Sequence, residues 1–426
     1  MKHPVIYFQR LHFSTLKVFF LIFVALVFPR LFFSYRVIKT EKNKISYDFA
    51  LGIENINPEL LFSFNDNAGK VLSAALITNQ TGIDQAGTAT VDILRSHGIV
   101  IKTLFTPEQQ FITDQKKKTQ LPFPIKPMYK KDSQTFLLTQ ASFKGVDILL
   151  FDMQDMGMRQ TRYVKTLKYI LELAACSHKH LIVFDRPNLL GACVEGASHD
   201  NVSDGLAIPI RYGMTVGELA KFINTYLLPV PAELTVVPMK NYQRGMFAHQ
   251  PLSCQLSQNI NSIDSCHGYS FLGLLGEVTP FDIGIGTDKA FQCILLPEGV
   301  PFCKERWYQL KQVLCAQGIE STFYRYKSTR KKQYCSGLRL HIPDINKFSS
   351  CNTLIKIIQF FKECGVKLTF SKQFDIAAGT PLVREFLEGI ISDKEFKEKM
   401  NGELKKFFGR AFTAFIYKPL PRIILV

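Results

Sequence analysis

The chain has 426 residues, a formal net charge of +16 and 46% hydrophobic residues. This length is sufficient for two domains, each with its own core, and the hydrophobic content excludes wholesale disorder. The positive charge suits an anionic partner, which could be nucleic acid, an acidic lipid surface or a polyanionic cell-wall polymer. The basic runs at 116–118 and 330–332 lie in no motif that reads DNA or RNA, so we interpret them as solvated loops and expect no nucleic-acid partner.

The N-terminal segment has the pattern of an export signal. Lys2, Arg10 and Lys17 precede the uncharged apolar run Val18–Phe28. This run has the length of the apolar region of a signal peptide and is short for a membrane span, and no Ala-x-Ala cleavage site follows it. We therefore predict that residues 1–36 are an export signal, either cleaved or retained as a membrane anchor. The protein is then periplasmic or anchored to the inner membrane.

The ten cysteines lie between Cys176 and Cys364 and contain no Cys-x-x-Cys pair. Zinc-ribbon and thioredoxin-like sites therefore have no support, and we expect no metal site. In an exported protein some of these cysteines would be paired, whereas in a reduced one they would be small core residues.

Short apolar runs alternate with amphipathic stretches from about Val71. The apolar runs predict strands within 71–82, 98–110, 146–155, 180–188 and 233–239, and the amphipathic stretches predict helices at 87–97, 161–179 and 214–227. Strands that alternate with helices imply right-handed parallel crossovers, so we predict an α/β fold with a doubly wound parallel sheet.

The alternation ends near Pro238, where a loop-rich region begins. A strand pattern, "SGLRLHI", and a helix pattern, "TLIKIIQFFKECG", follow it. We therefore place the main domain at 45–238 and a smaller α+β domain at 239–426.

Four of the predicted strands end in polar residues. These sets are Thr78-Asn79-Gln80-Thr81, Glu108-Gln109-Gln110, Asp152-Gln154-Asp155 with Arg159, and Asp185-Arg186-Pro187-Asn188. In an open parallel sheet, ligands bind outside the carboxyl ends of the strands. Four polar sets at this edge favour a binding cleft.

Each residue also has a structural interpretation. Asp155 could cap a helix, Asp185 could form an ion pair with Arg186, and Asn79 could hold a turn. Glu108 follows "LFTP" and caps no obvious helix, so the two interpretations are evenly balanced for it. No Gly-x-Gly-x-x-Gly or Gly-x-Ser-x-Gly motif follows a strand, so we expect neither a dinucleotide cofactor nor a serine hydrolase.

Six motifs occur in order along the chain. They are "LITNQTG" at 76–82, "LFTPEQQF" at 104–111, "LLFDMQDMGMRQTRY" at 149–163, "DRPNLLGA" at 185–192, "RYGMTVGELA" at 211–220 and "GEVTPFDIGIGTDKAFQ" at 276–292. In this order and rough spacing the chain resembles the exo-β-N-acetylmuramidase family of NamZ type. A weaker likeness extends to about Ile390.

The resemblance implies a Rossmann-like catalytic domain, with a smaller second domain that closes the cleft. It implies an exported enzyme that releases N-acetylmuramic acid from the non-reducing ends of peptidoglycan fragments. Glu108 occupies the position of the family's leading catalytic residue and would protonate the leaving oxygen as general acid. Asp152 and Asp155 are candidates either for the second catalytic carboxylate or for binding sugar hydroxyls.

The matching motifs also supply candidates for substrate binding. Arg159 and Arg186 could bind the lactyl carboxylate of muramic acid, because guanidinium pairs with carboxylate through two parallel hydrogen bonds. The other candidates are Asn79, Gln154, Tyr163, Asp185, Asn188 and Arg211.

The chain departs from the family pattern at several positions. Gln109 and Gln110 replace the His and Gly that follow the glutamate, and 160–162 replaces an aromatic-rich run. In the last motif, Pro280, Asp282, Ile285 and Gln292 replace Asn, Ser, Arg and Glu. Two hypotheses follow, an active exo-muramidase and a divergent member that binds peptidoglycan without cleaving it efficiently. A nucleic-acid-binding protein, the third class, would require an affinity that falls steeply with salt.

Overall fold

The computed structural model describes residues 48–57, 59, 63, 71–108, 111, 121–131, 133, 135–196, 205–248, 250, 252–328 and 331–426. The predicted export segment, 1–36, lies outside these residues, as do Gln109, Gln110 and the basic run 116–118. Within the described part of the chain, no helix combines the length and the apolar character that crossing a bilayer requires.

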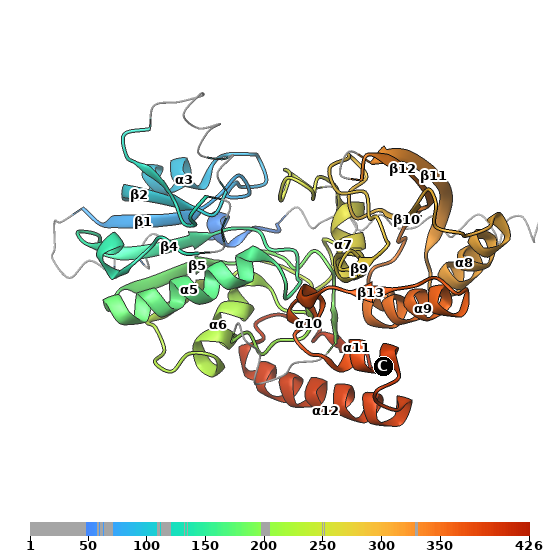
Figure 1. The fold of residues 1–426 in the computed structure, drawn as a ribbon. Coiled ribbons are helices and arrows are strands. Elements are labelled where there is room, and N and C mark those ends of the chain that lie inside the picture. Colours follow the sequence, from blue (N-terminus) through green and yellow to red (C-terminus); the bar gives the residue numbers. More distant parts are fainter. Residues whose placement is uncertain are drawn as a thin grey trace, which may run out of the picture. The chain divides into compact units, whose positions relative to one another are not determined.

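Six parallel strands form the main sheet (Figure 1). This confirms the predicted doubly wound parallel sheet, to which the sequence assigned five of the six strands. In spatial order they are β3 (Ile125–Pro127), β2 (Val100–Thr106), β1 (Ser73–Thr78), β4 (Ile148–Asp152), β5 (His180–Phe184) and β8 (Leu234–Val237). The chain order reverses between β1 and β4, which gives the sheet the Rossmann-like topology and places a crevice at the carboxyl ends of these two strands. β1 and β4 are buried along their whole length, which explains their continuous apolar sequences.

Helices cover both faces of the sheet. α3 (Thr90–Ser96) lies on one side of it, and α5 (Arg162–Ser177) and α6 (Val216–Tyr226) lie on the other (Figure 1). The buried residues of α5 recur at intervals of three and four, so that one stripe of the helix faces the core. Short 3-10 helices lie at η1 (Gly52–Glu54), η2 (Gln140–Phe143) and η3 (Phe412–Ala414).

The second, smaller domain is built on antiparallel sheets. One sheet has the order β10 (Cys293–Pro297), β12 (Gln333–His341), β11 (Glu320–Ser328), and another pairs β13 (Thr369–Phe370) with β9 (Val278–Thr279). The surrounding helices are α7 (Ile263–Leu275), α8 (Lys304–Ala316), α9 (Ser350–Glu363), α10 (Lys372–Ala378) and α11 (Leu382–Glu388). All ten cysteines lie within the described residues and are unpaired.

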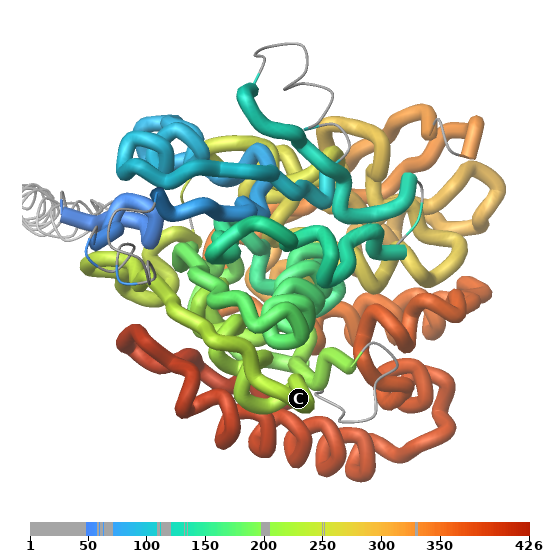
Figure 2. Tube along the Cα trace, turned by 90° about the vertical axis from the view of Figure 1, so that its left-hand side faces the viewer, coloured from blue at the N-terminus to red at the C-terminus, as the bar shows by residue number. Residues whose placement is uncertain are grey.

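The C-terminal helix α12 (Asp393–Ala411) returns to the main domain. Figures 1 and 2 show it beneath α6, and the Phe407 ring lies 5.0 Å from the Phe222 ring of α6. Leu404 and Ala411 belong to the same hydrophobic core as α5 and α6. The last strand, β14 (Arg422–Ile423), pairs with β6 (Cys193–Glu195), which pairs with β7 (Arg211–Tyr212). The domain boundary near residue 238 stays a prediction.

A buried ion pair connects β6 and β7 to the second domain. Arg211 donates to Glu195 at 2.7 Å, and both side chains are fully buried. Glu195 also accepts from the backbone N–H of Ser350 at 2.8 Å, at the N-terminus of α9, where a negative charge is favourable. Arg211 donates further to the carbonyl of Phe348 at 3.0 Å.

Asp185, at the end of β5, holds the start of α6 and the C-terminal segment. Its Oδ1 accepts from the backbone N–H of Gly217 at 2.7 Å, and its Oδ2 accepts from the hydroxyls of Thr215 at 2.9 Å and Tyr417 at 2.6 Å. A Cβ atom at Gly217 would lie 2.8 Å from the Asp185 Cγ, so this approach requires glycine. Burial raises the pKa of the Asp185 carboxyl to about 7.

Because the pKa of Asp185 is raised in the folded protein, the free energy of unfolding depends on pH. Between about pH 4 and pH 7 an unfolded chain has already lost the Asp185 proton while the folded chain retains it, so the contribution of Asp185 to stability falls as pH rises and levels off above pH 7. Asp185→Asn resembles the protonated form and removes this titration. We expect the unfolding free energy of the wild type, relative to Asp185→Asn, to decline by a few kcal/mol between pH 4 and pH 7.

Urea denaturation at several pH values measures this difference, with Asp393→Asn at an exposed carboxylate of α12 as the control. A wild type that gains stability relative to Asp185→Asn over the same range would contradict the assignment.

Candidate active site

The carboxyl ends of β1, β4 and β5 meet at one edge of the sheet. Thr78 and Asp152 are register partners, and the Thr78 hydroxyl donates to the Asp152 carbonyl at 2.7 Å. The Gln154 backbone N–H donates to the Thr81 hydroxyl at 2.8 Å, and its side chain donates to the Pro187 carbonyl at 2.7 Å. Three of the four predicted polar sets are thus in direct contact.

Asp152 and Arg186 form a buried ion pair at this edge. Asp152 is fully buried, and the Arg186 Nε and Nη2 donate to its two oxygens at 2.5 and 2.8 Å. The Thr90 hydroxyl donates to the same carboxylate, and Arg186 donates to the Ile83 carbonyl at 2.8 Å. The structural alternative of an Asp185–Arg186 ion pair is wrong. The backbone N–H of Arg186 donates to Asp185, whereas the Arg186 guanidinium donates to Asp152.

Asp155 is also buried and fully engaged. Its Oδ1 accepts from the Thr161 hydroxyl at 2.5 Å, and its Oδ2 accepts from the Gly157 N–H at 2.7 Å and from the Tyr212 hydroxyl. Burial raises the pKa of this carboxyl, although these hydrogen bonds oppose the shift. The N-cap of α5 is Thr161, so Asp155 holds the preceding turn and does not cap the helix.

Arg159 and Asn188 lie in the interior rather than toward a cleft. Arg159 is buried and donates to the carbonyls of Leu206 at 3.1 Å and Ile376 at 2.9 Å, which joins the β4 loop to α10. The Asn188 amide donates to the Met214 carbonyl at 2.9 Å. Arg211 and Asp185 occupy the buried positions described above.

Asn79 forms the turn that follows β1. Its Oδ1 accepts from the backbone N–H of Thr81 at 2.9 Å and from the Thr81 hydroxyl at 2.6 Å. This geometry matches the structural interpretation of Asn79 as a turn residue.

Glu108 differs from the buried carboxylates. It follows β2 and is only partly buried, whereas Asp152, Asp155 and Asp185 are buried. The Tyr163 hydroxyl lies 3.0 Å from the Glu108 Oε1 and 2.6 Å from the carbonyl oxygen of Leu256.

Tyr163 and its neighbour Arg162 bring the start of α5 against the end of β2. Arg162 lies over the Tyr129 ring, 5.1 Å from its centroid, and its Nη1 is 3.5 Å from the Pro107 carbonyl oxygen. Glu108, the one described residue of the fourth predicted polar set, therefore contacts the first turn of α5. Burial, followed by the nearby Glu108 charge, raises the pKa of Tyr163, so its hydroxyl remains a proton donor at neutral pH.

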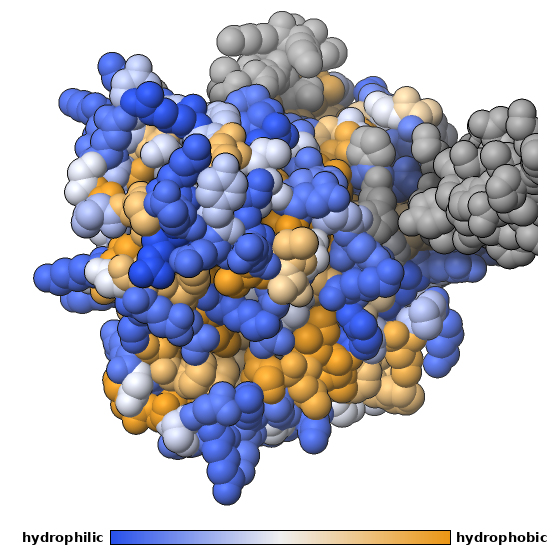
Figure 3. Space-filling view, turned by 90° about the vertical axis from the view of Figure 1, so that its right-hand side faces the viewer, coloured by the Kyte–Doolittle hydropathy of each residue, from blue (hydrophilic) through white to orange (hydrophobic). Residues whose placement is uncertain are grey.

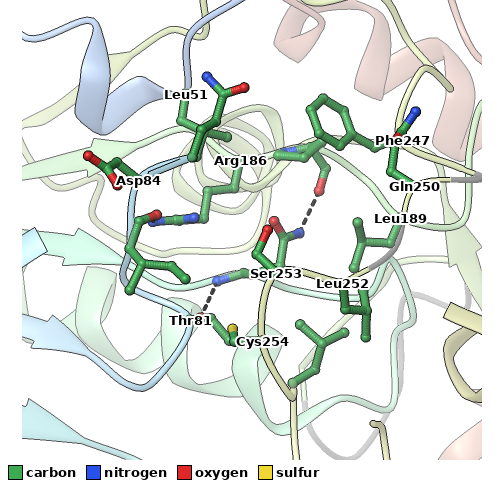
Figure 4. A pocket seen from close by; sticks show the side chains of 15 residues that line it. Leu51, Thr81, Asp84, Arg186, Leu189, Phe247, Gln250, Leu252, Ser253 and Cys254 are labelled. Carbon is green, nitrogen blue, oxygen red and sulfur yellow. Dashed lines mark hydrogen bonds between the residues drawn. The ribbon is translucent and has the colours of Figure 1, made fainter. Parts of the chain in front are cut away.

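A small pocket of about 80 Å³ lies beside these strand ends (Figure 4). Thr81, Gln154 and Arg186, which follow the strands β1, β4 and β5, line the pocket. Residues of the 247–256 loop, among them Phe247 and Cys254, line it as well. The same loop is attached to the β1 end by Gln80, whose amide donates to the Leu256 carbonyl at 2.9 Å. No sequence motif marks this loop, and none of its residues is among the predicted site residues.

The replaced positions of the last motif are integrated into the second domain. Asp282 accepts from the Tyr326 hydroxyl at 2.6 Å and from the Ser328 hydroxyl at 3.1 Å. The Gln292 amide donates to the Ser265 hydroxyl at 3.0 Å, and Ile285 packs against the hydrophobic core. Within the described residues, no cluster of three or more His, Cys, Asp or Glu side chains could hold a metal ion.

The chain is similar to proteins of one family over most of its length. Two family models match consecutive segments, the N-terminal part of exo-β-N-acetylmuramidase NamZ at residues 74–264 and its C-terminal part at 267–417. Peptidoglycan β-N-acetylmuramidase NamZ of Bacillus subtilis is 30% identical over 354 residues, which cover 78% of this chain and 84% of that protein.

Two solved structures of DUF1343 family proteins from Bacteroides fragilis have the same fold. They superpose with TM-scores of 0.72 and 0.64 at 25% and 24% identity, and each match covers 87% of this chain and 99% of the solved chain. Together with the matches to both family models, the similarity to the Bacillus protein shows that this chain belongs to the NamZ family of exo-β-N-acetylmuramidases.

Proposed function

We propose that this protein releases N-acetylmuramic acid from the non-reducing ends of peptidoglycan fragments, with Glu108 as the general acid. The family supports a glycosidase that acts on peptidoglycan-derived substrate. The observation that carries the residue assignment is the partial exposure of Glu108 at the strand ends, where the other predicted carboxylates are buried. A general acid must reach the leaving oxygen, and Glu108 has an accessible side from which to do so.

Tyr163 allows Glu108 to take up and release a proton in place. A phenol has one proton, so Tyr163 cannot donate fully to both Glu108 and the Leu256 carbonyl at the same time. When Glu108 is a carboxylate, it accepts from the Tyr163 hydroxyl. When Glu108 is protonated, its own O–H can donate to the Tyr163 oxygen while Tyr163 donates to Leu256. Both protonation states that the reaction requires thus have a hydrogen bond.

The hydrogen bonds of Asp152 and Asp155 indicate a structural role for both carboxylates. Each carboxylate already accepts three or more hydrogen bonds from neighbouring side chains or backbone. A nucleophile or a base that activates water needs a free oxygen lone pair directed at the sugar. We therefore propose that Asp152 and Asp155 fix the strand ends and leave bond cleavage to Glu108 and a second group.

Arg186 is the best candidate for binding the lactyl carboxylate. It lines the pocket together with the Gln154 and Gln250 side chains. Its guanidinium is held in position by Asp152, so little side-chain freedom remains to be lost when an anionic group binds. Arg159 has a different role in this proposal, since its Nε and Nη1 are bound to backbone carbonyls.

A catalytically impaired, glycan-binding member of the family is the second candidate. The observation that favours it is Ile285, which packs on the core of the second domain at a position where the family pattern has arginine. Loss of this charged donor would weaken contacts from the second domain to the substrate, while the sheet side of the cleft would still bind a sugar.

Replacing Glu108 tests the central assignment. Glu108→Gln keeps the shape of the side chain and its contact with Tyr163 but carries no transferable proton. We expect release of muramic acid from a MurNAc-GlcNAc disaccharide to fall by about 10²- to 10⁴-fold, with binding of the disaccharide retained. Glu233→Gln, at a glutamate that is 81% exposed beside His180, is the matched control and keeps full turnover.

Two outcomes would change the assignment. Full turnover by Glu108→Gln would exclude Glu108 as the acid. A wild type that binds the disaccharide but releases no more sugar than the variant would favour the glycan-binding alternative.

Removing the Tyr163 hydroxyl tests how Glu108 is positioned. Tyr163→Phe keeps the ring in the core and deletes one hydrogen bond to the carboxyl, which we expect to lower kcat by about 10- to 100-fold with a smaller change in KM. Tyr169→Phe, on the same helix, deletes a comparable hydroxyl contact of 2.7 Å to the Leu138 carbonyl and serves as the control. Equal losses in the two variants would show that general destabilisation of α5, and not positioning of Glu108, causes the effect.

We also propose that the protein is exported by its N-terminal segment, because peptidoglycan lies outside the cytoplasmic membrane. The apolar run Val18–Phe28 supports this proposal. N-terminal sequencing of the protein from membrane and soluble fractions tests whether the segment is cleaved or retained. A mature N-terminus beyond about residue 36 indicates cleavage, and Met1 retained in the membrane fraction indicates an anchor. Intact protein confined to the cytoplasm contradicts export.

A further inference from the structure

Aromatic rings and basic side chains alternate on an exposed surface of the second domain. This surface is formed by α8, β11 and the start of β12, and we name it the α8–β11 surface. It consists of Tyr308, Phe323, Tyr334, Lys304, Lys311 and Arg325.

The three rings of the α8–β11 surface are about half exposed. The exposed fractions are 49% for Tyr308, 46% for Phe323 and 42% for Tyr334. The Tyr308 and Phe323 rings meet edge to face, with centroids 5.1 Å apart, so α8 and β11 present them as a pair. Single exposed apolar residues are common on protein surfaces, but a group of large rings held together marks an interaction site more often.

A cation lies over each of these rings. The distance from the cation to the ring centroid is 5.9 Å for Lys304 over Tyr308, 5.4 Å for Lys311 over Phe323 and 4.3 Å for Arg325 over Tyr334. Alternate residues of a strand share one face, which places Arg325 beside Phe323 and within reach of Tyr334 on the neighbouring strand. Cation–π contacts of this kind hold the rings in position while the charges remain at the solvent boundary.

Positive charge is concentrated in this part of the chain. The 29 residues from 304 to 332 contain eight lysines and arginines against two glutamates, so they carry +6 of the chain's net +16. Arg325 already binds one carboxylate, that of Glu298 at 2.5 Å, and both side chains are at least half exposed. The surface can therefore bind carboxylate groups from solvent as well as apolar rings.

We propose that the α8–β11 surface binds the peptidoglycan polymer, separately from the cleft that contains Glu108. The C–H faces of the sugar rings pack on the exposed aromatic rings, and the basic side chains pair with the carboxylates of the lactyl groups and peptide stems. Figure 3 shows this side of the molecule, where apolar residues are interspersed among hydrophilic ones. The choice of peptidoglycan as the ligand rests on the proposed function. The identification of the α8–β11 surface as a binding surface rests only on its exposed rings and cation–π contacts.

This surface gives the enzyme a way to remain on an insoluble substrate. An exo-acting enzyme finds few chain ends in a large polymer, and a second binding surface raises the effective concentration of those ends around the cleft. Attraction between a basic surface and an anionic glycan also speeds the encounter.

Co-sedimentation with insoluble peptidoglycan sacculi tests the proposal. The surface variant is Phe323→Ser with Arg325→Gln and Tyr334→Ser, and the control variant is Lys405→Gln with Phe412→Ser, which changes exposed residues on α12 and η3. We expect the surface variant to bind sacculi about tenfold more weakly than the wild type and the control variant to bind like the wild type. Binding of the wild type to chitin, a neutral glycan, is expected to be weaker because chitin lacks carboxylates.

Equal sedimentation of the wild type and the surface variant would overturn the proposal. If the surface variant in that case also lost binding to duplex DNA, the surface would be assigned to nucleic acid. Where thermal melting shows that the surface variant is destabilised, Arg325→Gln with Lys327→Gln tests the charge contribution alone and is expected to weaken binding to sacculi at low salt.

Measuring the cleavage rate of the soluble disaccharide distinguishes a failure of the proposed binding surface from a failure of the proposed catalytic function. The surface variant is expected to cleave the soluble disaccharide at the wild-type rate, because the altered residues lie on the second domain, on β11 and β12, away from the end of β2. Sedimentation requires no catalysis, so its result can be interpreted even when Glu108 is not the acid.

Discussion

The buried ion pair between Asp152 and Arg186 determines how the polar edge of the sheet is arranged. It joins the ends of β4 and β5, next to the point where the strand order reverses, and the Thr90 hydroxyl and the Ile83 carbonyl complete its hydrogen bonds. Buried charges are tolerated when each is paired and hydrogen-bonded, so these segments cannot separate without exposing an unpaired charge. The two loops that follow these strands are joined by a separate hydrogen bond, from the Gln154 amide to the Pro187 carbonyl. Preorganisation of this edge therefore begins with Asp152, which holds the Arg186 guanidinium in a fixed position beside the pocket.

The carboxylates at this edge have different surroundings, and we propose different roles for them on that basis. Asp152 is neutralised by arginine, Asp155 accepts from hydroxyl and backbone donors, and Glu108 keeps one accessible side and a single tyrosine contact. Environment in this way assigns acid, base and structural functions to otherwise similar groups. The second domain contributes as well, because Ile376 of its helix α10 accepts a hydrogen bond from Arg159. The 247–256 loop lines the pocket beside Arg186. Cleavage at the sheet and retention on the polymer at the α8–β11 surface would then be tasks of different domains.

The sequence predicted the main sheet well and the edges of the fold less well. Five of its six strands correspond to apolar runs long enough to be recognised, and α5 was predicted within two residues of its observed ends. β3 was missed because it has only three residues, ends in Pro127 and pairs with one neighbour. The 247–256 loop was missed for a different reason. Its residues have no periodicity or motif, and only the fold brings Leu256 to the hydroxyl of Tyr163, 93 positions away.

The sequence by itself determined the α/β class, the family and the concentration of polar residues after four strands. Those features depend on local residue patterns and on the order of motifs, both of which can be recognised in the sequence alone. Only the tertiary structure decided which of those residues remain accessible. Asp152 and Arg186 are 34 residues apart, and nothing local to either indicates that each satisfies the other. Burial and pairing are properties of contacts between distant segments. Ten of the eleven predicted site residues are therefore buried and hydrogen-bonded inside the protein, and only Glu108 among them is partly exposed.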